Sequence, residues 1–171
     1  MICIMGIDPG ISGAVAFYFP DSGRVSVHDM PVADGRVNGA SIAAMIAQMN
    51  PDYAVFELVG AMPGQGVSSM FNFGTSFGIV IGVIAACNVR NHLVTPAKWK
   101  KHFRLSADKE ASRALALRMF PANAEHFARK KDNGRAEAAL LALYGYDAAL
   151  FGPSKNTRVR EGEGVAGVPG S

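Results

Sequence analysis

The chain has 171 residues, of which 49% are hydrophobic and 18% charged, with only two cysteines. This composition is typical of one globular domain, excludes a disulfide-rich scaffold, and contains no apolar run continuous enough to predict a membrane span. The formal net charge of +3 conceals an asymmetry, because residues 1–97 carry a net −3 and residues 98–160 a net +8. A basic half indicates a polyanionic partner, most simply nucleic acid, although a solvated basic helix surface would have the same composition.

Domain organisation and location follow from the two ends of the chain. Residues 1–151 are expected to form one domain, and the Gly- and Pro-rich residues 152–171 a flexible tail. The N-terminus lacks the basic region and cleavage pattern of a signal peptide. Cys3 and Cys87 have no metal-ligand spacing and are interpreted as buried thiols. The expected setting is therefore a reducing cytosol.

The first 58 residues predict four strands and one helix. The opening run is apolar throughout, as in a central strand, and Pro9-Gly10 turns the chain back into a second strand. A further turn leads to a third strand, in which apolar and polar residues alternate, and this strand completes an antiparallel meander. A loop over 31–38 and a helix then lead to a short buried strand, which we expect to pair in parallel with a neighbour. The expected ranges are strands at 1–8, 13–19, 24–30 and 53–58, with the helix at 39–49.

The remainder of the chain is predicted to be mostly helical. Residues 59–70 are too rich in glycine for regular structure, and residues 71–89 form a long helix with glycine at every fourth position. Each glycine costs about 1 kcal/mol relative to alanine, so we expect another backbone to approach that face closely, with ordinary helix-on-sheet packing as the alternative. The later elements are a strand at 92–95, a helix from Thr95-Pro96, a helix capped by Ser106 or Asp108 that ends near 120, a basic loop at 129–134 and a helix at 136–150. The sequence thus predicts an α/β domain with a mixed five-stranded sheet flanked by helices.

Four acidic residues are candidates for a metal site. Asp8 and Glu57 each lie near the end of a buried strand, and Asp132 and Glu137 flank the start of the last helix. If the first and fourth strands are neighbours, Asp8 and Glu57 can share one face of the sheet. Carboxylates gathered in this way bind Mg²⁺ or Mn²⁺, and two such ions about 4 Å apart can hold a phosphodiester for hydrolysis.

Each acid also has a structural interpretation. Asp8 could accept hydrogen bonds from the turn that follows it, Glu57 could form a salt bridge, and Asp132 could cap the helix. Glu137 could lie on a solvated face, but apolar residues three, four and seven positions later share its side of the helix. That spacing indicates that Glu137 points inward.

Six ordered segments resemble the RuvC-type Holliday junction resolvases of the RNase H-like superfamily, most closely the phage and chloroplast branch. They span residues 1–150 and read I-M-G-I-D-P-G-I-S-G-A, V-F-E-L-V, M-P-G-Q-G-V-S-S-M-F-N-F-G, T-P-A-K-W-K-K-H-F, S-A-D-K-E and D-N-G-R-A-E-A-A-L-L-A-L-Y-G. The resemblance implies an RNase H-like fold and a homodimeric, Mg²⁺- or Mn²⁺-dependent endonuclease. It also implies cleavage of four-way junctions, and of other branched DNA, in recombination and repair or in the processing of phage DNA.

The same resemblance assigns roles to individual acids. By motif match, Asp8 and Glu57 are metal ligands, and Glu137 takes the place of the final helix acid. In the bacterial branch a second acid precedes that residue by three positions, where this chain has Gly134. Asp132 is then the expected substitute as a metal ligand and catalytic residue.

Basic side chains are expected to contact the DNA. The resemblance gives Lys101 and Lys109 the places of two family lysines near the cleaved or neighbouring phosphates, so both join the catalytic set. The basic segment 98–135 supplies further phosphate contacts. The expected basic DNA-binding residues are Lys98, Lys100, Lys101, Arg104, Lys109, Arg113, Lys130, Lys131 and Arg135.

Apolar side chains beside flexible glycines form a second group of expected DNA contacts. Met62, Phe71 and Phe73 could wedge into the open centre of a junction, although both phenylalanines could instead pack in the core or a dimer interface. The glycine-lined helix at 71–89 is the candidate dimer interface. Trp99 is expected to be packed inside the protein and not stacked on a base.

Three other functions are weighed against a junction endonuclease. An actin-like or sugar-kinase-like ATP-binding domain has a similar N-terminal hairpin, but it needs a second one, which this sequence lacks. A non-catalytic DNA-binding module would leave all four acids structural. Within the nucleases, an RNase H acting on RNA–DNA hybrids is the main competitor.

Overall fold

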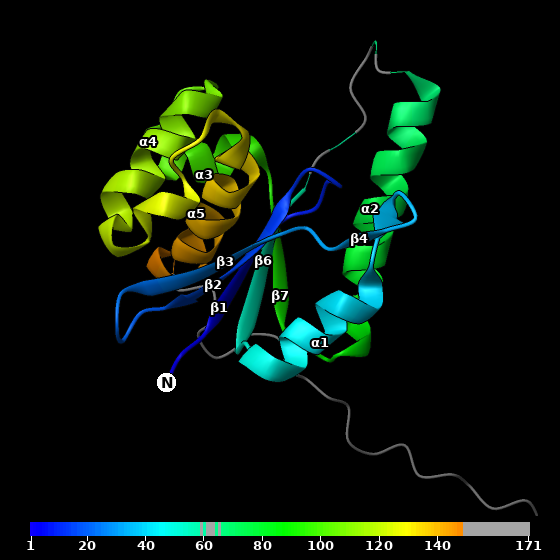
Figure 1. The fold of residues 1–171 in the computed structure, drawn as a ribbon, viewed down its shortest axis with the longest axis horizontal. Helices are drawn as coiled ribbons and strands as arrows, with labels where there is room; N and C mark the ends of the chain where they lie inside the picture. Colours follow the sequence, from blue (N-terminus) through cyan, green and yellow to red (C-terminus); the bar gives the residue numbers. More distant parts are fainter. Residues whose placement is uncertain (59, 61–63, 65, 149–171) are drawn as a thin grey trace, which may run out of the picture.

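A mixed five-stranded sheet forms the centre of the computed structural model, which describes residues 1–58, 60, 64 and 66–148 (Figure 1). Its strand order is β3-β2-β1-β6-β7. The first three strands make the predicted antiparallel meander, and the last two run parallel to β1. The bounds are β1 (Ile4–Asp8), β2 (Ala14–Phe19), β3 (Arg24–Asp29), β6 (Tyr53–Glu57) and β7 (Asn91–Val94).

Helices cover both faces of this sheet and create two hydrophobic cores (Figure 1). One face packs against α3 (Pro96–His102), α4 (Lys109–Met119) and α5 (Asn133–Asp147), and the other against α1 (Gly39–Met49) and α2 (Val67–Ala86). Two short 3₁₀ helices, η1 (Pro121–His126) and η2 (Lys130–Asp132), join α4 to α5. The predicted fold class, a mixed five-stranded sheet flanked by helices, is confirmed.

Successive residues of a strand point to opposite faces, which decides what each acid faces. Ile4 belongs to the core under α5, whereas Met5 and Ile7 belong to the core under α1 and α2. Asp8 therefore points to the α5 side. The same alternation in β6 places Val55 in the α5 core and Phe56 in the other, so Glu57 also points to the α5 side.

Two glycines allow α5 to lie directly on the sheet. A Cβ atom at Gly6 of β1 would come within 2.0 Å of the Ala138 carbonyl oxygen, and one at Gly145 of α5 within 2.7 Å of the Val55 side chain. Only glycine permits such an approach without moving the backbone. This contact brings the N-terminal half of α5, including Glu137, over the ends of β1 and β6.

Two loop predictions differ from the structure. The expected loop at 31–38 contains a small hairpin of β4 (Val32–Ala33) and β5 (Arg36–Val37). Asp34 and Gly35 between them both have positive φ, which is the geometry that Asp-Gly favours in a two-residue hairpin turn. The basic loop at 129–134 is largely helical, because α5 begins at Asn133 directly after η2.

Helix α2 begins at Val67, four residues before the predicted start, and much of it extends beyond the sheet (Figure 1). By length and composition alone it would suffice to cross a membrane, although a single helix of this kind is weak evidence for a membrane span. A Cβ atom at Gly74, Gly78 or Gly82 would meet nothing within 4 Å. The close backbone approach predicted for these glycines is therefore not made by the part of the chain that the structure describes.

Candidate active site

Three of the four predicted acids meet at the carboxyl ends of two parallel strands. Ile7 of β1 pairs with Phe56 of β6, so Asp8 and Glu57 are the next residues along neighbouring strands. Glu137 reaches the same place from α5. Together they line a hollow of about 550 Å³. Its rim carries Lys100, Lys109, Lys130, Lys131, Ser12, Asn133 and Phe73.

Asp8 is half-buried at the bottom of this hollow, at the turn that follows β1. Burial raises the pKa of its carboxyl group to about 7, and repulsion from Glu137 and Glu57 adds to the shift. A hydrogen bond from the Gly10 N–H and the charge of Lys109 act in the opposite direction. The turn interaction considered from the sequence is thus present, but it does not offset the cost of ionising Asp8.

Glu57 is almost fully buried, and its partner is the indole of Trp99. The Trp99 Nε1–H donates to Glu57 Oε1 at 2.8 Å. Burial raises the pKa of the Glu57 carboxyl group, and Glu137 adds to this, whereas the Trp99 hydrogen bond and Lys100 lower it. The salt bridge considered for Glu57 from the sequence is therefore replaced by a neutral donor.

Glu137 points inward from α5, as its spacing predicted, and it is buried. Its Oε1 atom lies 3.2 Å from Lys100 Nζ, and Lys100 is itself mostly covered. Lys100 comes from α3, next to Trp99 in the sequence. Two consecutive residues of one short helix therefore contact two different acids of the hollow.

Asp132 is not brought to this hollow. Its carboxylate accepts hydrogen bonds from the Arg129 backbone N–H at 2.9 Å and from the Arg129 guanidinium at 2.8 Å. These bonds keep the pKa of Asp132 below its ordinary value, chiefly through the guanidinium. Asp132, the last residue of η2, thus caps the start of that helix and lies outside the acid hollow.

The predicted basic residues separate into two groups. Lys100, Lys109, Lys130 and Lys131 line the acid hollow. Lys101 does not; with Arg104 it lines a neighbouring hollow of about 810 Å³, which shares Lys100 with the first. Lys98 is exposed on α3. The structure thus places Lys100, and not Lys101, beside the acids.

Two predicted DNA-binding arginines are already engaged within the chain. Arg135 forms a two-pronged ion pair with Asp29 at 2.6 and 2.7 Å. Arg113 donates to the carbonyl oxygens of Phe127 and Ala128 and pairs with Glu110. Arg135 thus ties α5 to the end of β3, and Arg113 ties α4 to the segment between η1 and η2.

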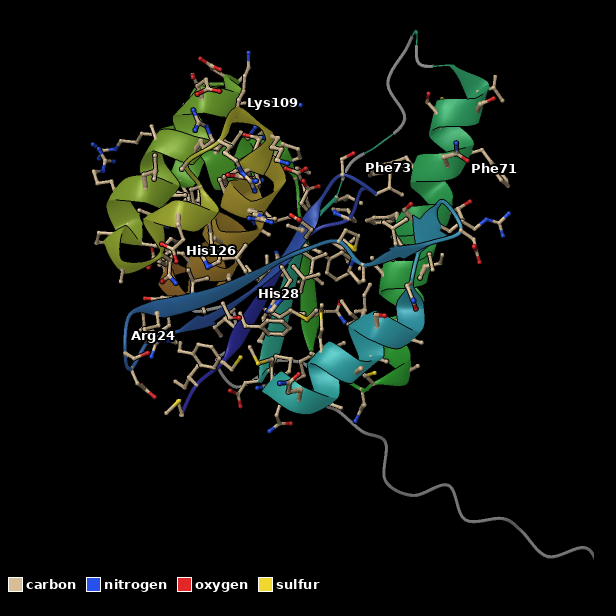
Figure 2. All side chains as sticks on the ribbon, in the orientation of Figure 1. Arg24, His28, Phe71, Phe73, Lys109 and His126 are labelled. Atoms are coloured by element: carbon tan, nitrogen blue, oxygen red, sulfur yellow. The ribbon has the colours of Figure 1, made fainter. Side chains whose placement is uncertain are left out.

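The aromatic pair on α2 divides between the two sides of the helix. In Figure 2, Phe73 points from α2 toward the sheet, whereas Phe71 points away from it. Phe73 lines the acid hollow and stacks on Phe77, with ring centroids 6.2 Å apart. Phe71 is 73% exposed. Met62, the third expected wedge residue, lies outside the described residues.

The donor set fits a divalent cation in its chemistry. It consists of carboxylate oxygens, which Mg²⁺ and Mn²⁺ prefer, and burial makes their negative charge costly without a cation. Asn133 adds a buried amide oxygen, Oδ1, that accepts no hydrogen bond from the described residues. However, no three His, Cys, Asp or Glu side chains of the described residues are already arranged to hold an ion.

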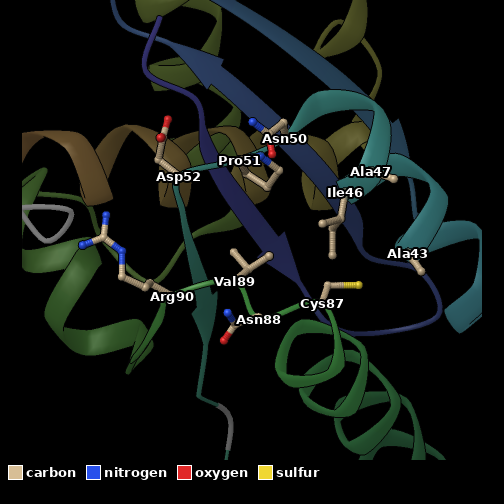
Figure 3. Close-up of a pocket in the computed structure, with 10 residues that line it drawn as sticks. All are labelled: Ala43, Ile46, Ala47, Asn50, Pro51, Asp52, Cys87, Asn88, Val89 and Arg90. Atoms are coloured by element: carbon tan, nitrogen blue, oxygen red, sulfur yellow. The ribbon is translucent and has the colours of Figure 1, made fainter. Parts of the chain in front are cut away.

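A third hollow, of about 420 Å³, lies at the opposite end of β6, where α1 and α2 finish (Figure 3). Asp52 and Arg90 stand at its edge, and Cys87, Val89 and Ile46 line its interior. The Asp52 carboxylate is already bonded to the Cys3 N–H at 2.8 Å. The hollow contributes nothing to the acid cluster.

Comparison of the sequence with known proteins finds a relative among the resolvases. No protein-family model matches the chain. It is 29% identical over 157 residues to the chloroplastic Holliday junction resolvase MOC1 of Chlamydomonas reinhardtii. The match covers 74% of this chain but only 18% of that protein, so the chain spans less than a fifth of its relative's length.

Comparison of the structure leads to the same group of proteins. T. thermophilus RuvC in complex with a Holliday junction substrate superposes with a TM-score of 0.63, covering 88% of this chain and 97% of that chain at 15% identity. Yeast mitochondrial resolvase Ydc2 gives 0.51 over 82% and 76% at 16% identity. The fowlpox virus resolvase gives 0.51 over 86% and 99% at 17% identity. The chain therefore has the fold of the RuvC-type Holliday junction resolvases, and the resemblance seen in its sequence is confirmed.

Proposed function

We propose that this protein is a divalent-metal-dependent endonuclease that cleaves four-way DNA junctions, acting in a reducing cytoplasm. The observation that carries the proposal is the meeting of Asp8, Glu57 and Glu137 from two strands and one helix, in a hollow rimmed by lysines. This combination serves phosphodiester hydrolysis, because carboxylates hold the cations and lysines hold the anionic substrate. The named activity of the resolvase relatives supports the choice of substrate.

The residues of the hollow have distinct tasks in this reaction. Bound Mg²⁺ or Mn²⁺, most simply as a pair of ions, would activate the attacking water and stabilise the leaving oxygen. Asp8, Glu57 and Glu137 hold the cations, and their crowded negative charge is what makes cation binding favourable. Lys109, with Lys130, holds the phosphates on either side of the cleaved bond and keeps the strand aligned over the acids.

Homodimerisation through α2 is part of the proposal. An exposed apolar and small-residue stripe follows one side of this helix and consists of Val67, Phe71, Gly74, Gly78, Ile81 and Ala85. Its glycines face open space, which would let a second helix approach closely. A second copy of the chain can supply such a helix, and a two-fold dimer presents two hollows to a two-fold symmetric junction.

Phe71 is the wedge residue that the described part of the chain best supports. It stands exposed in the first turns of α2, on the opposite side from Phe73, which packs toward the sheet. An apolar ring inserted where bases lack a stacking partner would stabilise an opened junction centre. We propose this role for Phe71 and assign Phe73 to the wall of the acid hollow.

An RNase H activity on RNA–DNA hybrids is the competing function on the same fold. The same three acids would serve it, so the discrimination comes from substrate shape and not from the catalytic residues. An ATP-binding domain is disfavoured, because the described residues contain one five-stranded sheet and one hairpin of the required type.

The deciding experiment offers one enzyme preparation four labelled substrates: a four-way junction, a flap, a linear duplex and an RNA–DNA hybrid. Each is incubated with Mg²⁺, with Mn²⁺ and with excess chelator. We expect symmetric cutting of the junction, weaker cutting of the flap, little cutting of the duplex or hybrid, and none in chelator. Preferential cutting of the hybrid would reassign the protein to the RNase H activity, and full activity in chelator would end the metal proposal.

A further inference from the structure

The only tryptophan of the chain is buried beside the candidate metal site. Trp99 lies in α3 with no exposed surface, and its Nε1–H donates to Glu57 Oε1 at 2.8 Å. A buried indole N–H needs an acceptor, and in most cores a backbone carbonyl would be sufficient. Here the acceptor is the carboxylate of an acid that lines the hollow.

The backbone fixes the position of the indole relative to this acid. Glu57, the last residue of β6, pairs directly with Val94, the last residue of β7. Thr95 and Pro96 follow at once as the N-cap and first residue of α3. Only one turn of helix then separates Pro96 from Trp99. The donor and the acceptor are therefore held by neighbouring strands through a short, stiff connection.

The Trp99 bond engages one of the two oxygens of the Glu57 carboxylate. This bond restricts rotation of a side chain that would otherwise have several rotamers. Lys100, the next residue, has its Nζ atom 5.3 Å from the centroid of the Trp99 ring and 3.2 Å from Glu137 Oε1. Helix α3 thus orients two of the three acids from its buried side.

We infer that Trp99 is a positioning residue, whose indole N–H holds the Glu57 carboxylate in the orientation that binds the divalent cation. The inference rests on the proposed function, since it assumes that Glu57 is a metal ligand. Hydrogen-bond partners of metal ligands commonly contribute 10–100-fold to metal affinity. A purely structural tryptophan would fill the same volume without affecting the metal.

Because the chain has one tryptophan, the hydrogen bond can be removed without changing the shape of the core. Biosynthetic replacement of tryptophan by benzothienylalanine substitutes sulfur for the N–H at Trp99 alone. Mn²⁺ binding to the full chain, without DNA, is then measured by calorimetry and by electron paramagnetic resonance. We expect the dissociation constant to rise about 10-fold or more, with thermal unfolding showing an intact fold. Equal affinity for both proteins would overturn the inference.

A second measurement follows the bond directly. In ¹⁵N-labelled protein the single indole N–H gives a single resonance, and Mg²⁺ should shift it in the wild-type chain. Glu57→Gln should move that resonance in the absence of metal and abolish its response to Mg²⁺. An indole resonance unaffected by both changes would show that Trp99 is only a packing residue.

Conventional variants provide an independent check. Trp99→Phe removes both the N–H and part of the ring, so it is compared with Phe120→Leu, a truncation of a buried aromatic in the same core that lies outside the hollow. We expect weakened Mn²⁺ binding only for Trp99→Phe. If the wild-type chain itself binds no Mn²⁺, the proposed metal site is refuted. If the wild-type chain binds Mn²⁺ and both variants bind it as tightly as wild type, only the role of Trp99 is refuted.

Discussion

Asp8 lies where an ionised carboxylate destabilises the fold. This effect can be tested by measuring stability as a function of pH. Its pKa in the folded protein is about 7, against an ordinary value of 3.8. Folding is therefore favoured when Asp8 is protonated, and this contribution, complete below about pH 4, is lost as the pH rises through 7. In chelator, Asp8→Asn should be more stable than wild type at pH 8 by on the order of 2 kcal/mol, allowing for partial solvent exposure.

The measurement is thermal or urea unfolding of both proteins between pH 5 and pH 8. The advantage of Asp8→Asn should shrink steadily toward pH 5, and Mg²⁺ should stabilise the wild type more than the variant at pH 8. A difference that does not change with pH would contradict the electrostatic account of Asp8.

The same substitution separates substrate binding from chemistry. Asp8→Asn should leave junction affinity largely unchanged, because the lysines on the rim remain. It should reduce cleavage by more than about 100-fold, because loss of a metal ligand lowers activity more than loss of a hydrogen-bond partner of a ligand. Gel-shift and cleavage assays on one labelled junction measure both quantities. Lost binding with unchanged residual cleavage would remove Asp8 from the metal site.

Gly134 explains at the level of one residue why this chain departs from the bacterial pattern. A Cβ atom there would lie 2.8 Å from the Ser12 carbonyl oxygen and 3.1 Å from the Cα atom of Gly13. The start of α5 thus touches the turn after Asp8, and no side chain fits between them. An acid at this position would force apart the two elements that bring Asp8 and Glu137 together.

Gly134→Ala is therefore expected to lower the stability of the fold, although the same change usually stabilises a helix. In an open helix the change would stabilise by about 1 kcal/mol, but here overpacking should cost about 1–3 kcal/mol. Gly82→Ala in α2, where a Cβ atom also meets nothing and which is not one of the stripe residues, is the matched control and should not destabilise. Urea unfolding of both variants measures the difference, and a stabilised Gly134→Ala would show that the contact with the turn is looser than described.

At the scale of elements, the exposed stripe on α2 predicts how the protein assembles. Gly78→Glu places a charge at the centre of the stripe without a clash in the protomer, because the glycine faces open space. Light scattering after gel filtration should show a dimer for the wild-type chain and a monomer for this variant. Ala44→Glu, which adds the same charge at an exposed position of α1, should leave the dimer intact. A monomeric wild type would refute the interface.

Elements whose signals are local in sequence were predictable, and those set by contacts were not. Asn38 and Asp108 cap α1 and α4 with side-chain hydrogen bonds, and apolar spacing marks both helices. The small hairpin also has a local signal, because the pair Asp34-Gly35 is typical of a two-residue hairpin turn, but the prediction of a loop did not use it. By contrast, the four early residues of α2 follow glycines that normally disfavour helix, so composition alone indicated a loop.

For the whole molecule, the uneven charge predicts the salt dependence of DNA binding. The described part of the basic half folds as α3, α4, the 3₁₀ helices and α5, on one side of the sheet, and four of its lysines line the acid hollow. In Figure 2, Lys109 lies near the end of the sheet that carries the acid hollow, and Arg24 lies toward the opposite end. Phosphate contacts should therefore come from one end of the molecule.

Lys130→Gln should weaken junction binding for every junction sequence alike and reduce the slope of log K against log salt by about 1. Arg24→Gln, which removes an equal and equally exposed charge far from the hollow, should leave the slope unchanged. Fluorescence anisotropy over a range of salt concentrations measures both. Equal slopes of log K against log salt for the two variants would show that Lys130 acts only through the overall charge of the protein and not through a phosphate contact.

Local patterns in the sequence were sufficient to predict the five strands, their meander and crossover, and the presence of Asp8, Glu57 and Glu137 on elements that converge. Those features depend on period, turn residues and strand alternation, which are properties of neighbouring residues. Three contacts could be found only in the folded chain: Lys100 and not Lys101 meets the acids, Asp132 is bound by Arg129, and Trp99 donates to Glu57. Consecutive helical residues point about 100° apart, so a small rotation of α3 on the sheet would exchange their roles. That rotation is set by close packing between segments distant in sequence, where local patterns carry no information.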